Sequence, residues 1–236
     1  MTTTATEVVR FWREAGAQAW FNGGEAFDRQ CESRFLDAHL AAARRGHEDW
    51  LDTAEGALAL LLLLDQIPRN IFRGSGHAFA SDGLARHYAG RALAAGHDGA
   101  FEPMLRAFFY LPFEHSEEMA DQRRSVELFQ ALGVELYTKY AVEHLQVIER
   151  FGRFPHRNRA LGRESTPEEQ AWLDAGGGFW THVGADSSAT RGTRHSGRRM
   201  RPGVAHEDGL LHGRPLSSAA RCRRLRPPSG RYRLRR

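Results

Sequence analysis

The stretch ALALLLLLDQIPRNI, at residues 57–71, decides the fold class. Large apolar side chains recur along it at helical spacing, at Leu60, Leu64, Ile67 and Ile71. The uninterrupted apolar run ends at Asp65, whereas a membrane span needs roughly 20 apolar residues. We therefore predict a buried helix that begins near Thr53 and is bent or restarted at Pro68.

Segments on both sides of this stretch have the same helical character. The other predicted helices run from Thr6 through Trp12, from Glu25 to Arg45 before Gly46, from Ser81 or Asp82 to Ala95, from Ser116 to Gly133, and from Val134 to Phe151 before Gly152. The string TPEE at 166–169 is a capping box with proline at the first helical position. No run shows sustained strand alternation, so we predict an all-α protein. The short loops predict antiparallel neighbouring helices, arranged either as a bundle or as stacked helical hairpins.

The chain changes character near residue 176. Residues 176–236 contain 14 Arg and 3 acidic residues, a balance of +11, whereas residues 1–175 have a balance of −7. We predict one helical-hairpin domain at 1–175 and a disordered tail rich in Arg, Gly, Ser and Pro at 176–236. Two origins of the tail stay open. It is either a basic arm that contacts nucleic acid, or a nonnative end read out of frame, which its abundant arginine without lysine favours.

The remaining composition argues against several classes of protein. The two cysteines, Cys31 and Cys222, are far apart and lack metal-ligand spacing, so we predict neither a disulfide framework nor a metal site. The segment after Met1 has no basic or apolar part of a signal peptide, and a cytoplasmic location without membrane attachment is expected. Neither a phosphate-binding glycine loop nor a nucleophile elbow occurs, so no cofactor is predicted.

Four strings occur in order along the first three quarters of the chain. They are LLLLDQIPRNIFRG at 61–74, AFASDGLA at 78–85, FFYLPFEHSEEMADQRRSVELFQALG at 108–133 and VIERFGRFPHRNRALGRESTPEEQAWL at 147–173. Together they resemble the bacterial family known only as domain of unknown function nine-twenty-four, over roughly residues 6–175. The resemblance implies tetratricopeptide-like stacking of the helical hairpins and implies no activity.

The first polar motif follows the apolar run. Gln66, Arg69, Asn70 and Arg73 are spaced to share one helix face. Guanidinium groups donate in a rigid fork, so this set could bind a carboxylate or a phosphate. The alternative is a structural polar face, because Asp65 stands four residues before Arg69 and can form an intrahelical ion pair.

The second motif joins a carboxylate to an imidazole. Glu114 and His115 could perform general acid–base chemistry, because histidine titrates near neutral pH, and Asp121 and Gln122 follow on the next predicted helix. Capping of that helix from Ser116 is the alternative. A metal held here is disfavoured, because no two histidines share a short ligand spacing.

The third motif leaves a helix through Gly152. Arg153, His156, Arg157 and Asn158 would form an anion-binding surface on a loop. The alternative is that the neighbouring aromatic side chains fill the core while the arginines satisfy carbonyls at the helix end. The aromatic run at 108–110 is predicted to be core.

These three motifs could line one pocket if the hairpins bring them together. Arg69, Arg73, Arg153 and Arg157 would then hold a small anionic molecule or an acidic peptide. Two other functions stay open. One is a hydrolase- or lyase-type enzyme that uses Glu114, His115 or His156, and the other is a structural scaffold for protein interactions, in which the polar residues mainly cap helices.

Overall fold

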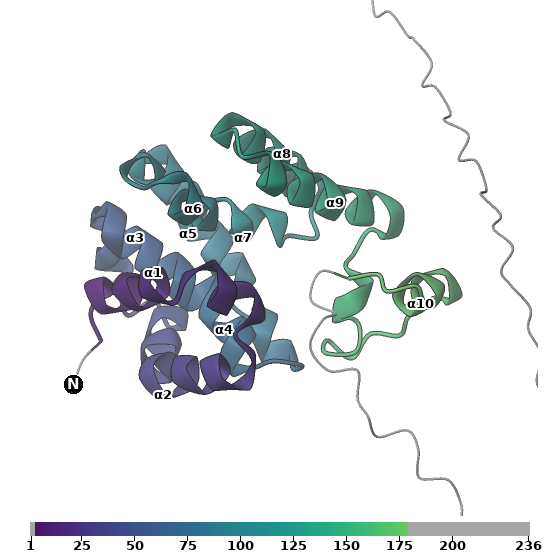
Figure 1. Cartoon of the computed structure of the whole chain (residues 1–236), viewed down its shortest axis with the longest axis horizontal. Helices are drawn as coiled ribbons and strands as arrows, with labels where there is room; N and C mark the ends of the chain where they lie inside the picture. The colour runs from purple at the N-terminus through teal and green to yellow at the C-terminus, as the bar shows by residue number, and fades with distance from the viewer. Residues whose placement is uncertain (1–2, 179–236) are drawn as a thin grey trace, which may run out of the picture. The chain divides into compact units, whose positions relative to one another are not determined.

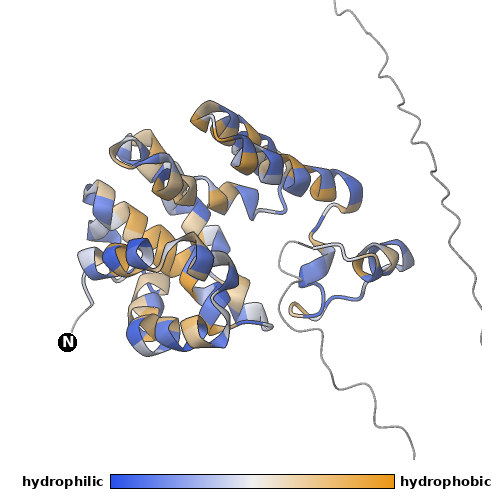
Figure 2. Cartoon of the chain, viewed as in Figure 1, coloured by the Kyte–Doolittle hydropathy of each residue, from blue (hydrophilic) through white to orange (hydrophobic). Residues whose placement is uncertain are grey.

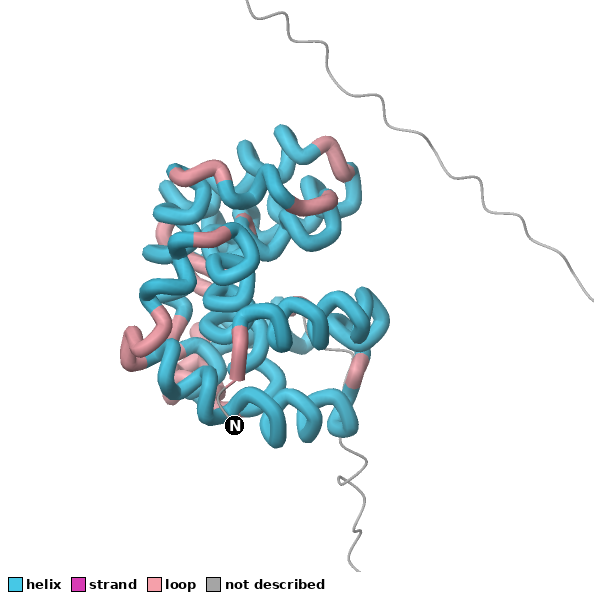
Figure 3. The backbone as a smooth tube through the Cα atoms, turned by 90° about the vertical axis from the view of Figure 1, so that its left-hand side faces the viewer, coloured by secondary structure: helices cyan, strands magenta, loops and turns pink. Residues whose placement is uncertain are grey.

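The computed structural model describes residues 3–178 of the chain (Figure 1). Within that range every regular element is a helix and no strand occurs (Figure 3), so the prediction of an all-α protein is confirmed. The α-helices are α1 (Ala5–Asn22), α2 (Gly24–Ala43), α3 (Ala54–Leu61), α4 (Ile67–Ile71), α5 (Asp82–Ala94), α6 (Pro103–Arg106), α7 (Leu111–Glu114), α8 (Met119–Leu132), α9 (Glu135–Phe151) and α10 (Pro167–Asp174). The predicted tail, with its nucleic-acid arm, lies outside the described residues apart from its first three.

Most predicted helix ends agree with the structure, and two starts differ. Gly133 and Gly152 end α8 and α9 in the left-handed region, where glycine has no Cβ to clash. The helix α1 is capped by Thr4, in a capping box with Glu7, instead of Thr6. The helix α8 begins at Met119 instead of at Ser116, whose hydroxyl accepts from the backbone N–H of Glu118 in the preceding turn.

The predicted helix at residues 57–71 is interrupted before Pro68. The helix α3 ends at Leu61, a π-helical turn occupies Leu62–Gln66, and α4 follows, with Pro68 in its first turn. Such a turn and a proline both leave carbonyl groups without their usual helical donors. Ser81 satisfies one by donating to the Leu64 carbonyl at 2.6 Å, and His39 Nδ1 lies 2.7 Å from the Leu63 carbonyl.

This interrupted helix forms the centre of the core. Every side chain from Ala57 to Gln66 is buried, including Asp65, and Figure 2 shows the apolar ribbon surrounded by more polar helices. The helix α3 packs against α1 and α5, and α2 packs against α4. The largest buried side chains around it are aromatic: Trp12, Phe35, Tyr88, Phe109 and Phe129.

The helices α8 and α9 form a hairpin joined at Gly133. The tetratricopeptide-like stacking of hairpins stays a prediction. No helix among residues 3–178 has both the length and the apolar character needed to cross a bilayer.

Candidate functional site

A pocket of about 560 Å³ lies among the α1–α2 junction, the end of the π-helical turn, and α6 to α9. Its walls are largely aromatic or aliphatic, with Trp20, Phe108, Leu111, Phe129, Tyr137 and Tyr140 among them. The polar side chains that line it include Gln66, Arg73, Glu114, His115, Glu143 and His144. An apolar pocket of this size with a few polar groups is typical of a site for a small organic molecule.

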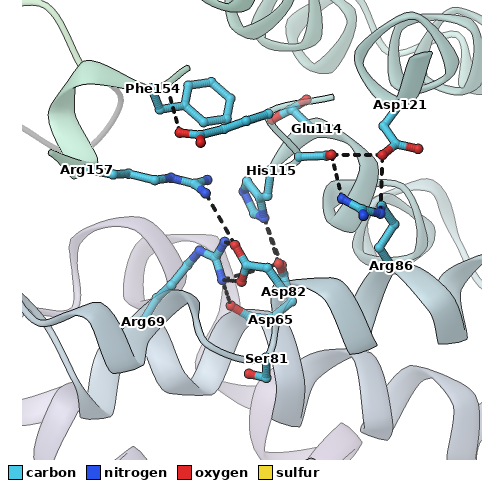
Figure 4. A network of polar contacts seen from close by, with 12 residues as sticks. Asp65, Arg69, Ser81, Asp82, Arg86, Glu114, His115, Asp121, Phe154 and Arg157 are labelled. Carbon is cyan, nitrogen blue, oxygen red and sulfur yellow. Dashed lines mark hydrogen bonds and ion pairs between the residues drawn. The ribbon is translucent and has the colours of Figure 1, made fainter. Parts of the chain in front are cut away.

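The Asp65 carboxylate orients the His115 ring inside the fold (Figure 4). Nδ1 of His115 lies 2.8 Å and 3.0 Å from the two carboxylate oxygens, and both side chains are buried. Burial lowers the pKa of His115, although Asp65 opposes this, so the ring is neutral at neutral pH. A neutral ring donates its Nδ1 proton to the carboxylate, which leaves Nε2 as the basic nitrogen for a ligand.

Asp65 remains ionised although it is 1% exposed. Arg69 lies 3.2 Å from one of its oxygens, and Gln66 donates to the other at 2.5 Å. Burial acts to raise the pKa of Asp65, but Arg69 and His115 outweigh burial and hold that pKa well below its ordinary value. The predicted ion pair between Asp65 and Arg69 is therefore present, and it belongs to a larger buried cluster.

Glu114 is a buried carboxyl group without a strong cationic partner. Its Oε1 lies 3.5 Å from Nδ1 of His144, which also lies 2.8 Å from the Tyr140 carbonyl oxygen. Its Oε2 is buried and has no hydrogen-bond partner among the described residues. Burial, assisted by the negative charge of Asp65, raises the pKa of Glu114 to about 8. At neutral pH this carboxyl group therefore carries a proton that it can donate at the pocket.

Asp82 joins two of the predicted arginines in one network (Figure 4). Arg69 donates to it through both η nitrogens, at 3.0 and 2.9 Å, and Nη1 of Arg157 lies 3.3 Å away. Burial, with repulsion from Arg69, lowers the pKa of Arg157 to about 10, so this side chain stays charged at neutral pH. Two guanidinium groups thus balance Asp65 and Asp82, and neither arginine lines the pocket.

The other two predicted arginines are also paired. Arg73 holds Asp28 through Nε and Nη2, both at 2.7 Å, yet its side chain is 43% exposed and lines the pocket. Arg153 binds both oxygens of Glu169, at 2.6 and 2.8 Å, outside the pocket lining. Only Arg73 of the four arginines is therefore placed to meet a ligand in this pocket.

Several predicted polar residues support the backbone around the pocket. Gln122 donates to the carbonyls of Glu114 and Ser116, both at 2.6 Å, and so fixes the segment that carries His115. Asp121 accepts from the Ser116 hydroxyl at 2.8 Å and pairs with Arg86. The side-chain amide of Asn70 donates to the Gln66 carbonyl at 3.2 Å, whereas that of Asn158 donates to the side chains of Ser165 and Glu169, outside the pocket lining.

Apart from Asn70, Asp121 and Gln122, the predicted site residues therefore fall into three groups. Gln66, Arg73, Glu114 and His115 meet at the pocket. Arg69 and Arg157 lie in the ionic network of Asp65 and Asp82. Arg153, His156 and Asn158 lie outside the pocket lining, and burial together with Arg157 lowers the pKa of His156 to about 3.

Sequence reasoning misses several contributors to this site, among them Asp65, Asp82, His144 and Phe108. The sequence spacing predicts Arg69 as the partner of Asp65 and predicts no other partner. The position of Asp65 directly after a long apolar run is a signal that it is buried, and a buried charge must be well paired. Asp82 is predicted only as a helix cap, and His144 has no local motif. Phe108 is predicted to be core, and it is 3% exposed, but it also forms part of the pocket wall.

Comparisons with known proteins place the chain in a family. The family model described as bacterial protein of unknown function (DUF924) matches residues 8–177. No curated protein matches the chain. The solved structure of a protein of unknown function from Agrobacterium tumefaciens is 53% identical, with a TM-score of 0.70, and the match covers 72% of this chain and 97% of that one. The chain belongs to the bacterial DUF924 family.

Proposed function

We propose that the protein binds a small organic acid whose apolar body fills the pocket and whose anionic head meets Arg73. The observation that carries this proposal is the composition of the pocket lining. It combines a mostly aromatic wall with the half-exposed guanidinium of Arg73, the imidazoles of His115 and His144, and the protonated carboxyl group of Glu114. Its volume of about 560 Å³ suits a small molecule better than an acidic peptide.

The charges near the pocket support an anionic head group. Nε and Nη2 of Arg73 are occupied by Asp28, so Nη1 is the part of the guanidinium available to a ligand. Glu114 is neutral at neutral pH and can donate a hydrogen bond to a carboxylate instead of repelling it. Glu143 also lines the pocket, and its carboxylate favours a head group bound close to Arg73 instead.

The aromatic walls support an apolar body. Met104, Leu136 and Tyr140 are 46%, 54% and 45% exposed and all three line the pocket. Large apolar side chains that remain in water are a common feature of surfaces that a ligand or partner covers. Buried apolar area contributes roughly 25 cal/mol per Å², so the walls can supply much of the binding free energy.

A thermal-shift measurement on the full chain tests this proposal with phenylacetate and 2-phenylethanol. These probes share an aromatic ring, and only the first has a carboxylate. We expect phenylacetate to raise the melting temperature, by the equivalent of about 2.7 kcal/mol at a hundred times its dissociation constant. The shift should be lost in Arg73→Gln and retained in Arg29→Gln, at an exposed arginine that does not line the pocket.

Two results of this measurement would contradict the proposal. One is an equal shift with the neutral alcohol, which would remove the role of the charge. The other is an unchanged phenylacetate shift in Arg73→Gln. The melting temperature of each variant without probe serves as the folding control, since a surface ion pair contributes only about 0–1 kcal/mol.

An enzyme that moves protons is the second candidate function. The specific observation in its favour is the pair of His115 and Asp65, in which a buried carboxylate holds the histidine by Nδ1 while the ring lines the pocket. This is the arrangement that activates histidine as a base in many enzymes.

A further inference from the structure

We propose that this pocket catalyses proton transfer at a carbon next to a carbonyl group of its ligand, with His115 as the base and Glu114 as the hydrogen-bond donor to the carbonyl oxygen. This inference rests on the proposed function, because it requires a small organic ligand in the pocket. It adds a reaction class and a substrate class, a 2-oxo acid with an apolar side chain. Both groups line the same pocket and follow each other in sequence at the end of α7.

His115 has the orientation that a base requires. Its Nδ1 is fixed by two short contacts to Asp65, and Asp65 is held in turn by Arg69 and Gln66. The residue lines the pocket and is 4% exposed, so few water molecules compete for Nε2, the ring nitrogen that Asp65 leaves to a ligand. Asp65 acts through His115 and is a positioning residue.

Glu114 has the properties of a donor to an oxygen that gains negative charge. The side chain is buried, lines the pocket, and has one oxygen without a hydrogen-bond partner among the described residues. A carboxylic acid kept neutral by an apolar site can stabilise an enolate oxygen by donating its proton in a hydrogen bond. A buried polar atom without a partner is costly, and a ligand oxygen would satisfy it.

The proposed step is balanced without any further reactant. Nε2 of His115 takes a proton from the carbon beside the carbonyl group, and the electron pair of that C–H bond forms a carbon–carbon double bond. The carbonyl π electrons move to its oxygen, which Glu114 stabilises. When the proton on Nε2 has exchanged with solvent, the histidine returns a solvent proton to the same carbon, which replaces its hydrogen. Return of the proton to the oxygen instead yields the enol.

Covalent catalysis is disfavoured by the neighbours of His115. The Ser116 hydroxyl donates to Asp121 and accepts from Arg86, so it is engaged away from the histidine. The Cys31 thiol is buried, and burial raises its pKa to about 12, which leaves it a poor nucleophile. Proton transfer needs neither group.

The pH dependence of the step follows from groups on several elements. The titratable and charged groups that act on His115 or Glu114 are Asp65, Arg69, His144, His156 and Arg157. His115 must be neutral to accept a proton, so the rate should fall in acid, below pH 6.5. Glu114 must be protonated to donate, so the rate should also fall as pH rises through about 8.

Hydrogen exchange of phenylpyruvate in D₂O, followed by proton NMR, tests the proposal with the full chain. The probe has an aromatic ring, a carboxylate and an acidic C–H group beside a ketone. We expect the protein to accelerate loss of the benzylic proton signal over buffer alone by at least about a hundredfold. His115→Asn should abolish the acceleration, and His87→Asn, at an exposed histidine, should retain it.

Glu114→Gln separates a chemical role from a structural one. The amide still donates a hydrogen bond but does not titrate, so the variant should be slower by about tenfold and should lose the decline in rate above pH 8. A decline that persists unchanged in Glu114→Gln would overturn the assignment of Glu114.

Binding of phenylpyruvate, measured by thermal shift on the same samples, distinguishes the two proposals. Binding without accelerated exchange would overturn proton transfer and leave the binding function intact. Absence of both binding and exchange would contradict both proposals for this substrate class. Exchange that continues in His115→Asn would show that another group is the base.

Discussion

Asp65 is a buried carboxylate that shares its two oxygens among Arg69, His115 and Gln66. Removal of an ionised group from water costs several kcal/mol, and only well-placed partners offset this cost. Those partners come from its own helical segment and from the residue after α7, fifty positions away. One residue therefore links the centre of the core to the pocket.

Glu114→Gln should change how stability depends on pH. In the native protein the pKa of Glu114 is raised from 4.5 to about 8, so between these values the folded chain holds a proton that the unfolded chain has lost. The stability that this neutral carboxyl group contributes is fully present below pH 4.5 and is lost as pH rises through about 8. The amide of the variant does not titrate, so the variant lacks this loss.

Urea unfolding at about pH 5 and about pH 8.5 measures the effect. Relative to Glu114→Gln, the wild type should lose stability between the two conditions. Glu25→Gln, at a side chain that is 89% exposed, should follow the wild type. An equal pH slope in wild type and Glu114→Gln would show that Glu114 is already ionised in the folded protein at acidic pH.

Among the elements, the π-helical turn at Leu62–Gln66 is not predictable from the sequence pattern. Helical spacing of apolar residues and the proline at 68 correctly predict a helix and an interruption. The pattern cannot show that the interruption precedes Pro68, because the carbonyls it frees are satisfied by Ser81 and His39 from distant parts of the chain. Helix ends at Gly133 and Gly152 depend on local signals alone, and the sequence predicts them well.

The capping box of α10 provides a test of how a single helix end is stabilised. The Thr166 hydroxyl accepts from the Glu169 backbone, and Glu169 reaches back to the Thr166 backbone while it also binds Arg153. Thr166→Ala should lower the free energy of unfolding by about 1 kcal/mol. Thr166→Ser keeps the capping hydroxyl, so it should retain most of that stabilisation. Phenylacetate binding should not change, because α10 contributes no residue to the pocket lining.

Thermal or urea unfolding of these two variants measures the prediction. An equal loss in Thr166→Ser and Thr166→Ala would mean that the methyl group, and not the capping hydroxyl, stabilises this end of the domain.

For the molecule as a whole, the sequence correctly predicts the fold class and the family, but only part of the candidate site. Some residues that are predicted from separate local motifs do lie together in the fold, as Gln66 and His115 do at the pocket. The sequence motifs predict four arginines that bind a ligand, and this number is too high. Each of the four is paired with a carboxylate from another part of the chain or from its own helical segment. Such pairings depend on tertiary contacts that no local spacing reveals.

A crystal structure of the full chain with phenylacetate would show whether the pocket beside His115 binds a small organic acid. We predict the aromatic ring between Phe108 and Tyr137, and the carboxylate within hydrogen-bond distance of Arg73. A pocket that stays empty at saturating probe, or a carboxylate bound elsewhere on the protein, would show that the proposed binding site is wrong.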